Sequence, residues 1–174
     1  PHVVDNLDDA VAEWIIDGDF LRSLEFLDPL GSTGIALALA LLAGHAAIRC
    51  RVLAAGFAMA MVAGLVLSAT LRPLVARPRP DVGKFVGQID SYPSGHVLLS
   101  VVLAGLLPLA VAVLTDRTRI IRPLQVVLGI GVLAGALHRV AAGLHWPTDV
   151  VGGGLMGLGL VLAVQWVVDT GSSH

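Results

Sequence analysis

Two histidines, an arginine and an aspartate lie close together near the C-terminus, between two apolar runs, in the stretch 138–149. Polar groups at a membrane boundary cost free energy unless they are used. His145 and Asp149 are four residues apart, which is about one helical turn. A carboxylate placed there can accept a proton from one imidazole nitrogen and leave the other nitrogen as a base or nucleophile. Since Pro147 suits a first helical turn, we expect His145 just before a helix and Asp149 inside its first turn.

Three arginines follow an earlier apolar run. Arg72, Arg77 and Arg79 fall within eight residues, interleaved with prolines. Guanidinium groups can bind an anion with several oxygens, and prolines stiffen the loop that carries them. This pattern indicates an anion site. The alternative for this loop alone is interfacial anchoring, in which the arginines extend toward the aqueous phase.

Ser94, Gly95 and His96 stand at the start of a further apolar run. Ser94 can cap a helix, and Gly95 lets a ligand approach the backbone. Free N–H groups at a helix start favour an anion there. We expect His96 in the first turn, facing that anion; the alternative is a purely structural role for its imidazole.

A metal site is the competing interpretation of these polar residues. Zinc binds histidine and carboxylate ligands, and four such groups are available: His96, His138, His145 and Asp149. However, the arginine, serine and glycine donors expected around the same point suit a phosphate better than a dication. We therefore expect neither a metal nor another cofactor.

The elements that position these residues are membrane helices. Hydrophobic residues make up 56% of the chain and charged residues 14%, against about 25% charged residues in a soluble domain. The net charge of −2 predicts no nucleic-acid partner. Cys50 is alone, so an intrachain disulfide is excluded.

Five apolar runs are long enough to cross a hydrocarbon core about 30 Å thick. They cover residues 31–48, 52–75, 95–115, 120–138 and 149–168. We predict an all-α integral membrane protein with a bundle of five transmembrane helices, in a single domain over residues 31–174. Short basic turns, at 49–51 and 116–122, fall on one side of the membrane. Since basic loops favour the cytoplasm, we expect the chemistry-bearing loops at the outer face.

Residues 1–30 differ from the rest, because eight of the thirteen acidic residues lie in 5–28. Apolar residues recur there at helical spacing: Leu7, Val11, Trp14 and Ile15, and then Leu21, Leu24 and Leu27. We interpret this region as two short amphipathic helices on the membrane surface. The alternative is an acidic lead-in that serves only solubility.

The three polar groups, taken in the order in which they occur along the chain, resemble the motifs of the type 2 phosphatidic acid phosphatase family. This is the membrane branch of the superfamily that includes the vanadium haloperoxidases. The family's first motif is Lys, six residues, then Arg-Pro; here Arg72 precedes Arg79 and Pro80 at that spacing, with Arg in place of Lys. The second motif, Pro-Ser-Gly-His, is unchanged at residues 93–96. The resemblance spans about residues 52–168.

The third motif is Ser-Arg, five residues, His, three residues, Asp. Here it consists of His138 and Arg139, then His145, then Asp149, with His in place of Ser. Arg72 and His138 are therefore the two departures from the family pattern. They leave both motif histidines and the aspartate intact, and they predict an unusual substrate preference or pH profile.

The resemblance implies roles for these residues. His145 would attack phosphorus and form a phosphohistidine, with Asp149 orienting it, and His96 would protonate the leaving group. The phosphoryl oxygens would be bound by Arg72, Arg79, Arg139, Ser94 and the Gly95 amide. Family members have six membrane helices and an active site on the outer face, so we expect a first helix upstream of the five runs. In a complete chain with its N-terminus inside, the site would instead face the cytoplasm.

We therefore expect a metal-independent membrane phosphatase in a bacterial plasma membrane, with the lipid bilayer and a phosphorylated lipid as its partners. Polyprenyl phosphates or diphosphates are the first substrate class, and phosphatidylglycerol phosphate or phosphatidate the second. A lipid phosphotransferase, which passes the phosphoryl group to an alcohol, is a further enzyme class. A haloperoxidase is disfavoured because those relatives are soluble. A membrane scaffold or channel is the non-catalytic alternative.

Overall fold

The computed structural model describes residues 2–16, 31–80, 87–115 and 118–171. Every regular element in these ranges is a helix. The helices are α1 (His2–Ile16), α3 (Gly31–Arg49), α4 (Arg51–Val75), α5 (Gly95–Leu114), the short 3-10 helix η2 (Thr118–Ile120), α6 (Ile121–Ala141) and α7 (Pro147–Gly171). Each predicted apolar run corresponds to one helix, with ends that differ from the prediction by at most three residues.

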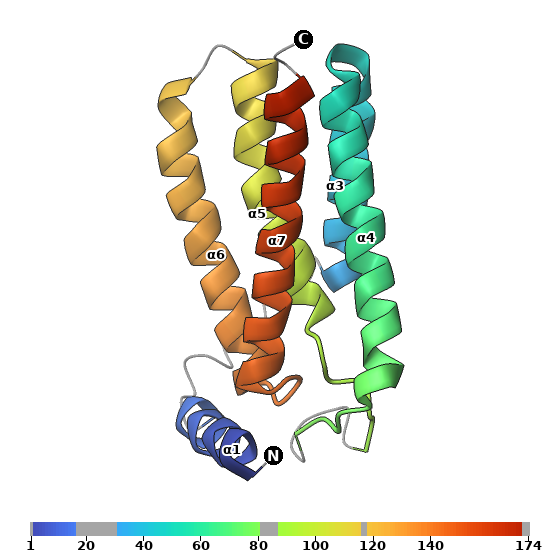
Figure 1. The fold of residues 1–174 in the computed structure, drawn as a ribbon. Helices are drawn as coiled ribbons and strands as arrows, with labels where there is room; N and C mark the ends of the chain where they lie inside the picture. The colour runs from blue at the N-terminus through green and yellow to red at the C-terminus, as the bar shows by residue number, and fades with distance from the viewer. Residues whose placement is uncertain (1, 17–30, 81–86, 116–117, 172–174) are drawn as a thin grey trace.

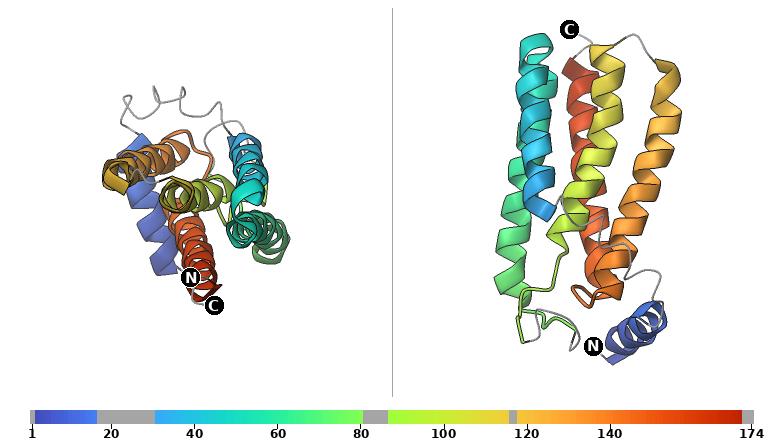
Figure 2. Two further views of the ribbon diagram at one scale, coloured as in Figure 1. Left: turned by 90° about the horizontal axis from the view of Figure 1, so that it is seen from above. Right: turned by 180° about the vertical axis from the view of Figure 1, so that it is seen from behind.

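The chain is an integral membrane protein of the all-α class. Four helices, α4 to α7, are long and apolar enough to cross a bilayer. The remaining predicted span corresponds to α3, which is shorter than these four helices and is apolar over Gly34–Arg49. It lies alongside α4 for its whole length (Figures 1 and 2).

Successive helices run in opposite directions, so the connections gather at two ends of the bundle (Figure 1). One end holds the basic turns around residues 50 and 118. The other end, here called the motif end, holds residues 76–80 and 87–94, the connection 142–146 and the helix α1. The predicted separation of basic turns from chemistry-bearing loops is thus confirmed.

The core of the bundle lies among α3, α4, α5 and α7. Its largest fully buried side chains include Phe57 and Leu53 of α4, Leu98 and Leu106 of α5, and Leu39 of α3. Large apolar side chains also cover the outside, as on α6, where Val126, Val127, Ile130 and Leu133 are exposed. Apolar residues on both the inside and the outside of a helix bundle are expected where the surrounding medium is lipid.

Glycines allow α7 to approach α5 closely. A Cβ atom at Gly153 would lie 2.5 Å from the Ser94 carbonyl oxygen, and one at Gly157 would lie 2.6 Å from the Leu98 carbonyl oxygen. Small residues at such crossings let helix backbones meet. The start of α5, which carries Ser94 and His96, is therefore held against the first turns of α7.

The amphipathic helix α1 packs across the motif end, on the ends of α6 and α7 (Figure 2). Ala12 and Ile15 pack against Val140 and Ala141 of α6. Leu7 and Trp14 are 60% and 79% exposed, so part of the apolar pattern faces away from the protein. The second predicted amphipathic helix, around Leu21, Leu24 and Leu27, lies outside the described residues.

Replacing Gly157 with alanine should destabilise the protein. The new methyl group would press on backbone and on Val101 of α5, and such overpacking costs about 1–3 kcal/mol. Gly159→Ala is the matched control, since nothing lies within 4 Å of its added Cβ atom. Thermal unfolding in detergent should show a lower midpoint for Gly157→Ala alone. Equal midpoints would contradict the close helix packing.

Candidate active site

The turn between α6 and α7 explains the spacing of the third motif. Gly143 adopts a φ of +64°, a left-handed conformation that glycine accepts readily. The chain folds back there, so that the amides of Leu144 and His145 donate to the Arg139 carbonyl oxygen at 3.0 and 3.2 Å. Arg139 and His145 are thereby brought to adjoining positions.

The start of α7 buries a carboxylate. Asp149 lies in the first turn of the helix and is 0% exposed. Its Oδ2 atom accepts a hydrogen bond from the Trp146 amide at 2.8 Å, which satisfies a free N–H group at the helix start. The predicted positions of Pro147, at the helix start, and of Asp149, in the first turn, are confirmed.

The imidazole of His145 is held by a backbone carbonyl. Its Nδ1 atom lies 2.8 Å from the Ser91 carbonyl oxygen but 3.7 Å from Asp149 Oδ2. The prediction of a direct hydrogen bond from His145 to the carboxylate is therefore wrong, because the Ser91 carbonyl oxygen lies closer to Nδ1. The hydroxyl of the same serine donates to Asp149. Since a carbonyl only accepts, Nδ1 carries a proton, and in the neutral imidazole Nε2 therefore keeps its lone pair.

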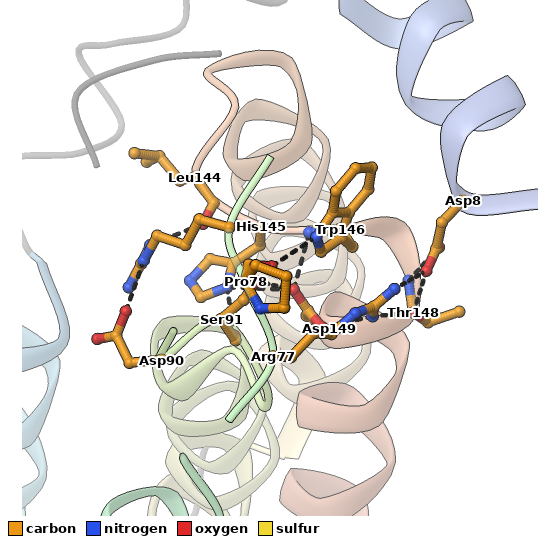
Figure 3. A network of polar contacts seen from close by, with 11 residues as sticks. Asp8, Arg77, Pro78, Asp90, Ser91, Leu144, His145, Trp146, Thr148 and Asp149 are labelled. Carbon is orange, nitrogen blue, oxygen red and sulfur yellow. Dashed lines mark hydrogen bonds and ion pairs between the residues drawn. The ribbon is translucent and has the colours of Figure 1, made fainter. Parts of the chain in front are cut away.

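Arg77 donates hydrogen bonds to three protein side chains (Figure 3). It donates to Asp149 at 2.8 Å, to the Thr148 hydroxyl at 2.6 Å and to Asp8 of α1. Its guanidinium carbon also lies 5.5 Å from the centre of the Trp146 ring. Burial acts to lower the pKa of Arg77, but the carboxylates of Asp8 and Asp149 outweigh it and raise that pKa. Of the three loop arginines, this one positions protein groups rather than presenting its fork to an anion.

Arg79 reaches the loop that carries His145. Its Nε atom donates to Asp90 at 2.8 Å, and its Nη1 atom donates to the Leu144 carbonyl oxygen at 2.7 Å. The hydrogen bond from Arg79 lowers the pKa of Asp90, burial opposes this, and the charges of Arg79 and Arg72 lower it further. Two of the predicted anion-binding arginines therefore lie near the same carboxylate.

His96 is bonded differently from His145. Its Nδ1 atom lies 2.7 Å from an Nη2 atom of Arg139. A guanidinium group only donates, so Nδ1 must accept and the proton of this imidazole is on Nε2. The two motif histidines thus hold opposite tautomers, His145 with a free Nε2 lone pair and His96 with an Nε2–H group.

Three buried polar atoms in the described part of the chain have no hydrogen-bond partner: Ser68 Oγ, Arg72 Nε and Ser94 Oγ. Ser94 stands at the N-cap of α5, yet its hydroxyl caps no amide. A Cβ atom at Gly95 would lie 2.7 Å from Ser68 Oγ and 2.9 Å from Arg72 Nη2. Because Gly95 has no side chain, the Ser68 hydroxyl and the Arg72 guanidinium can approach the start of α5. Each unsatisfied buried group costs about 1–3 kcal/mol, so an anion bound here would recover that free energy.

The contacts join all three motif segments at one place. Residues 51–172 match the family model described as the PAP2 superfamily. The chain belongs to the PAP2 superfamily. The resemblance drawn from the three motifs is thereby confirmed.

The PAP2 fold is also found in a solved structure. That structure is the first transmembrane PAP2 type phosphatidylglycerolphosphate phosphatase from Bacillus subtilis, with a TM-score of 0.76 and 22% sequence identity. The alignment covers 98% of this chain and 88% of that chain. A comparison with curated proteins found no match.

Four residues of this PAP2 site were not singled out from the sequence: Asp8, Ser68, Ser91 and Asp90. Ser68 is one helical turn before Arg72, a spacing that could have indicated it. Asp8 and Ser91 act through contacts between distant segments, whereas Asp90 pairs with Arg79 in the same connection. His138, which replaces the family serine, is buried at 3% exposure. In the described ranges, no three His, Cys, Asp or Glu side chains gather as a metal-binding group would.

Ser68→Ala should weaken the binding of an anion at this site. The variant removes a hydroxyl that has no protein partner, so its effect should appear only when the anion is bound. We expect the dissociation constant for vanadate to rise roughly fivefold, from the loss of one hydrogen bond of about 1 kcal/mol. Thr70→Val, at an exposed position on the same helix, should leave that constant unchanged. Equal vanadate affinities for both variants, by titration calorimetry, would remove Ser68 from the site.

Proposed function

We propose that this PAP2 protein is a metal-independent phosphatase that hydrolyses a lipid phosphate or diphosphate through a phosphohistidine on His145. The observation that supports this most directly is the pair of opposite imidazole tautomers. The Ser91 carbonyl at 2.8 Å leaves Nε2 of His145 free to attack, and Arg139 at 2.7 Å leaves a proton on Nε2 of His96.

In the first step, Nε2 of His145 attacks phosphorus and the bond from phosphorus to the leaving oxygen breaks. The positive charge that forms on the imidazole is stabilised by Asp149, whose Oδ2 atom is 3.7 Å from Nδ1. The carboxylate can do this because it is buried and ionised beside Arg77, at 2.8 Å. A positioned charge of this kind acts strongly in a site that excludes water.

His96 must gain a proton before it can protonate the leaving oxygen, since a neutral imidazole is too weak an acid. In the proposed cycle the phosphoryl oxygens attract the guanidinium of Arg139 away from His96. Nδ1 is then free to take up a proton, and Nε2 of the imidazolium gives its proton to the leaving group. In the second step, the resulting neutral His96 accepts a proton from the water that hydrolyses the phosphohistidine.

The remaining donors would neutralise the phosphoryl oxygens. Arg72, Arg79 and Arg139, with Ser94 and the Gly95 amide, are the groups proposed for this role. The unpartnered Arg72 Nε and Ser94 Oγ atoms support it, because a bound anion would supply their missing acceptors. Charge neutralisation by arginine is also why no metal is included in the cycle.

The site lies at the ends of apolar helices, so a lipid can keep its tail in the bilayer while its head group reaches His145. Polyprenyl phosphates or diphosphates are the first substrate class that we propose. Phosphatidylglycerol phosphate is the second candidate, because the similar solved structure is named as a phosphatidylglycerolphosphate phosphatase. Phosphate release from a panel of purified lipid phosphates, with and without acceptor alcohols, would identify the substrate and separate hydrolysis from phosphotransfer.

Variants of the site residues should distinguish the nucleophile, His145, from the general acid, His96. His145→Ala should abolish both turnover and any covalent phosphoenzyme. His96→Ala should slow turnover by roughly 10²–10⁴, and least for substrates with a good leaving group. Asp149→Asn should fall in between. Rapid-quench trapping of acid-labile phosphate tests this; phosphate trapped on His145→Ala but absent from His96→Ala would reverse the two roles.

Activity should survive a strong chelator, because arginines rather than a metal neutralise the phosphoryl charge in the proposed cycle. Vanadate should inhibit by occupying the place of the five-coordinate phosphorus. The measurement is phosphate release after dialysis against chelator, with and without added zinc or magnesium. Activity that is lost in chelator and restored by either cation would favour the metal interpretation of His96, His138, His145 and Asp149.

We also propose that the motif end faces outward. The basic turns lie at the opposite end, and such turns favour the cytoplasm. Cys50, the single cysteine, lies in one of those turns. A membrane-impermeant maleimide should therefore leave Cys50 unlabelled in intact cells, whereas Gln88→Cys in a Cys50→Ser background, at an exposed position of the motif end, should be labelled. The reverse pattern would place the site in the cytoplasm.

A further inference from the structure

The helix α1 contributes a buried carboxylate to the motif end. Asp8 is 1% exposed, whereas Asp9 and Glu13 on the same helix are exposed. A buried carboxylate costs free energy unless it is paired and hydrogen-bonded. Asp8 is both, so its burial reflects specific contacts rather than the general docking of an amphipathic helix.

Asp8 caps α7 from another part of the chain. Its Oδ1 atom accepts from the Thr148 amide at 3.0 Å, and its Oδ2 atom accepts from the Thr148 hydroxyl at 2.5 Å. The residue that precedes α7, Trp146, has an indole side chain, which offers no acceptor for free helix amides. Asp8 supplies that acceptor, and its charge is favourable at the positive end of the helix.

Asp8 also shares Arg77 with the site (Figure 3). One nitrogen of the guanidinium donates to Asp8 and another to Asp149 at 2.8 Å. Asp149 in turn accepts from the Ser91 hydroxyl, and the Ser91 carbonyl holds Nδ1 of His145 at 2.8 Å. A continuous set of hydrogen bonds therefore runs from α1 to the imidazole.

We infer that Asp8 is a positioning residue for the reaction, which holds Arg77 and the first turn of α7 so that Asp149 and Ser91 orient His145. This inference rests on the proposed role of His145 as nucleophile. Without the Asp8 carboxylate, the guanidinium loses one of its three side-chain partners, and the Thr148 amide in the first turn of α7 loses its acceptor. Asp149 and the imidazole then sample orientations in which Nε2 does not face phosphorus.

The test compares Asp8→Asn with Asp9→Asn, which removes the same charge from an exposed position of α1. We expect kcat to fall roughly 10- to 100-fold for Asp8→Asn, as misplacement of a reacting group by about 1 Å does. KM should stay within about twofold of the parent value, because the donors proposed for the phosphate are untouched. Asp9→Asn should match the parent, and Asp8→Glu should recover part of kcat because it keeps the carboxylate.

A double-mutant cycle with Arg77→Gln separates positioning from simple docking of α1. If Asp8 acts through Arg77, Asp8→Asn should cost little further activity when Arg77 is already replaced. If Asp8 only holds α1 in place, the two losses should multiply and should follow the loss of thermal stability. Assays well below the thermal midpoint of each variant keep these cases apart, and Asp8→Glu serves if Asp8→Asn does not fold.

The outcomes also separate the two proposals. An active parent whose Asp8→Asn and Asp9→Asn variants have equal kcat would overturn the inference on Asp8 alone. Losses that multiply in the cycle would do the same. A parent chain that releases no phosphate from any lipid phosphate would overturn the proposed function, and the positioning role with it.

Discussion

The buried carboxylate of Asp149 is the group on which the motif end depends. A charge that is 0% exposed must be compensated locally, and its compensation comes from separate parts of the chain. The Trp146 amide belongs to the start of its own helix, the Ser91 hydroxyl to the segment before α5, and Arg77 to the loop after α4. Burying this one carboxylate therefore requires three segments to meet, and the meeting point lies beside His145.

The chemistry of each histidine follows from what its Nδ1 atom contacts. At His145 this contact is a carbonyl oxygen, which only accepts hydrogen bonds, whereas at His96 it is a guanidinium group, which only donates them. Two identical side chains thereby present different groups to the same space. The difference is created by the residues around them, and the fixed order of helices places those residues on the same end of the bundle.

The sequence predicts much of this architecture because lipid imposes simple rules. A helix that crosses a bilayer must be long and apolar, so the runs at 52–75, 95–115 and 149–168 closely match α4, α5 and α7. The place of Asp149 in the first turn of α7 could also be predicted, because Pro147 marks the helix start.

Other features depend on contacts that a linear pattern does not encode. The partner of His145 is a backbone carbonyl, which is the same chemical group at every residue. Arg77 and Arg79 sit in identical Arg-Pro pairs, yet one contacts Asp8 and Asp149 while the other contacts Asp90 and Leu144. Helical spacing in α1 likewise could not predict that Asp8 is buried, because its partners are far along the chain.

The cap on α7 joins positions that are 140 residues apart. The ribosome makes α1 first and α7 last among the described helices, so Asp8 is present long before Thr148 exists. The hydrogen-bond network around His145 can close only after α7 has entered the bilayer. A chain in which α7 has not yet inserted thus lacks the complete site, and maturation of the proposed active site is tied to the insertion of α7.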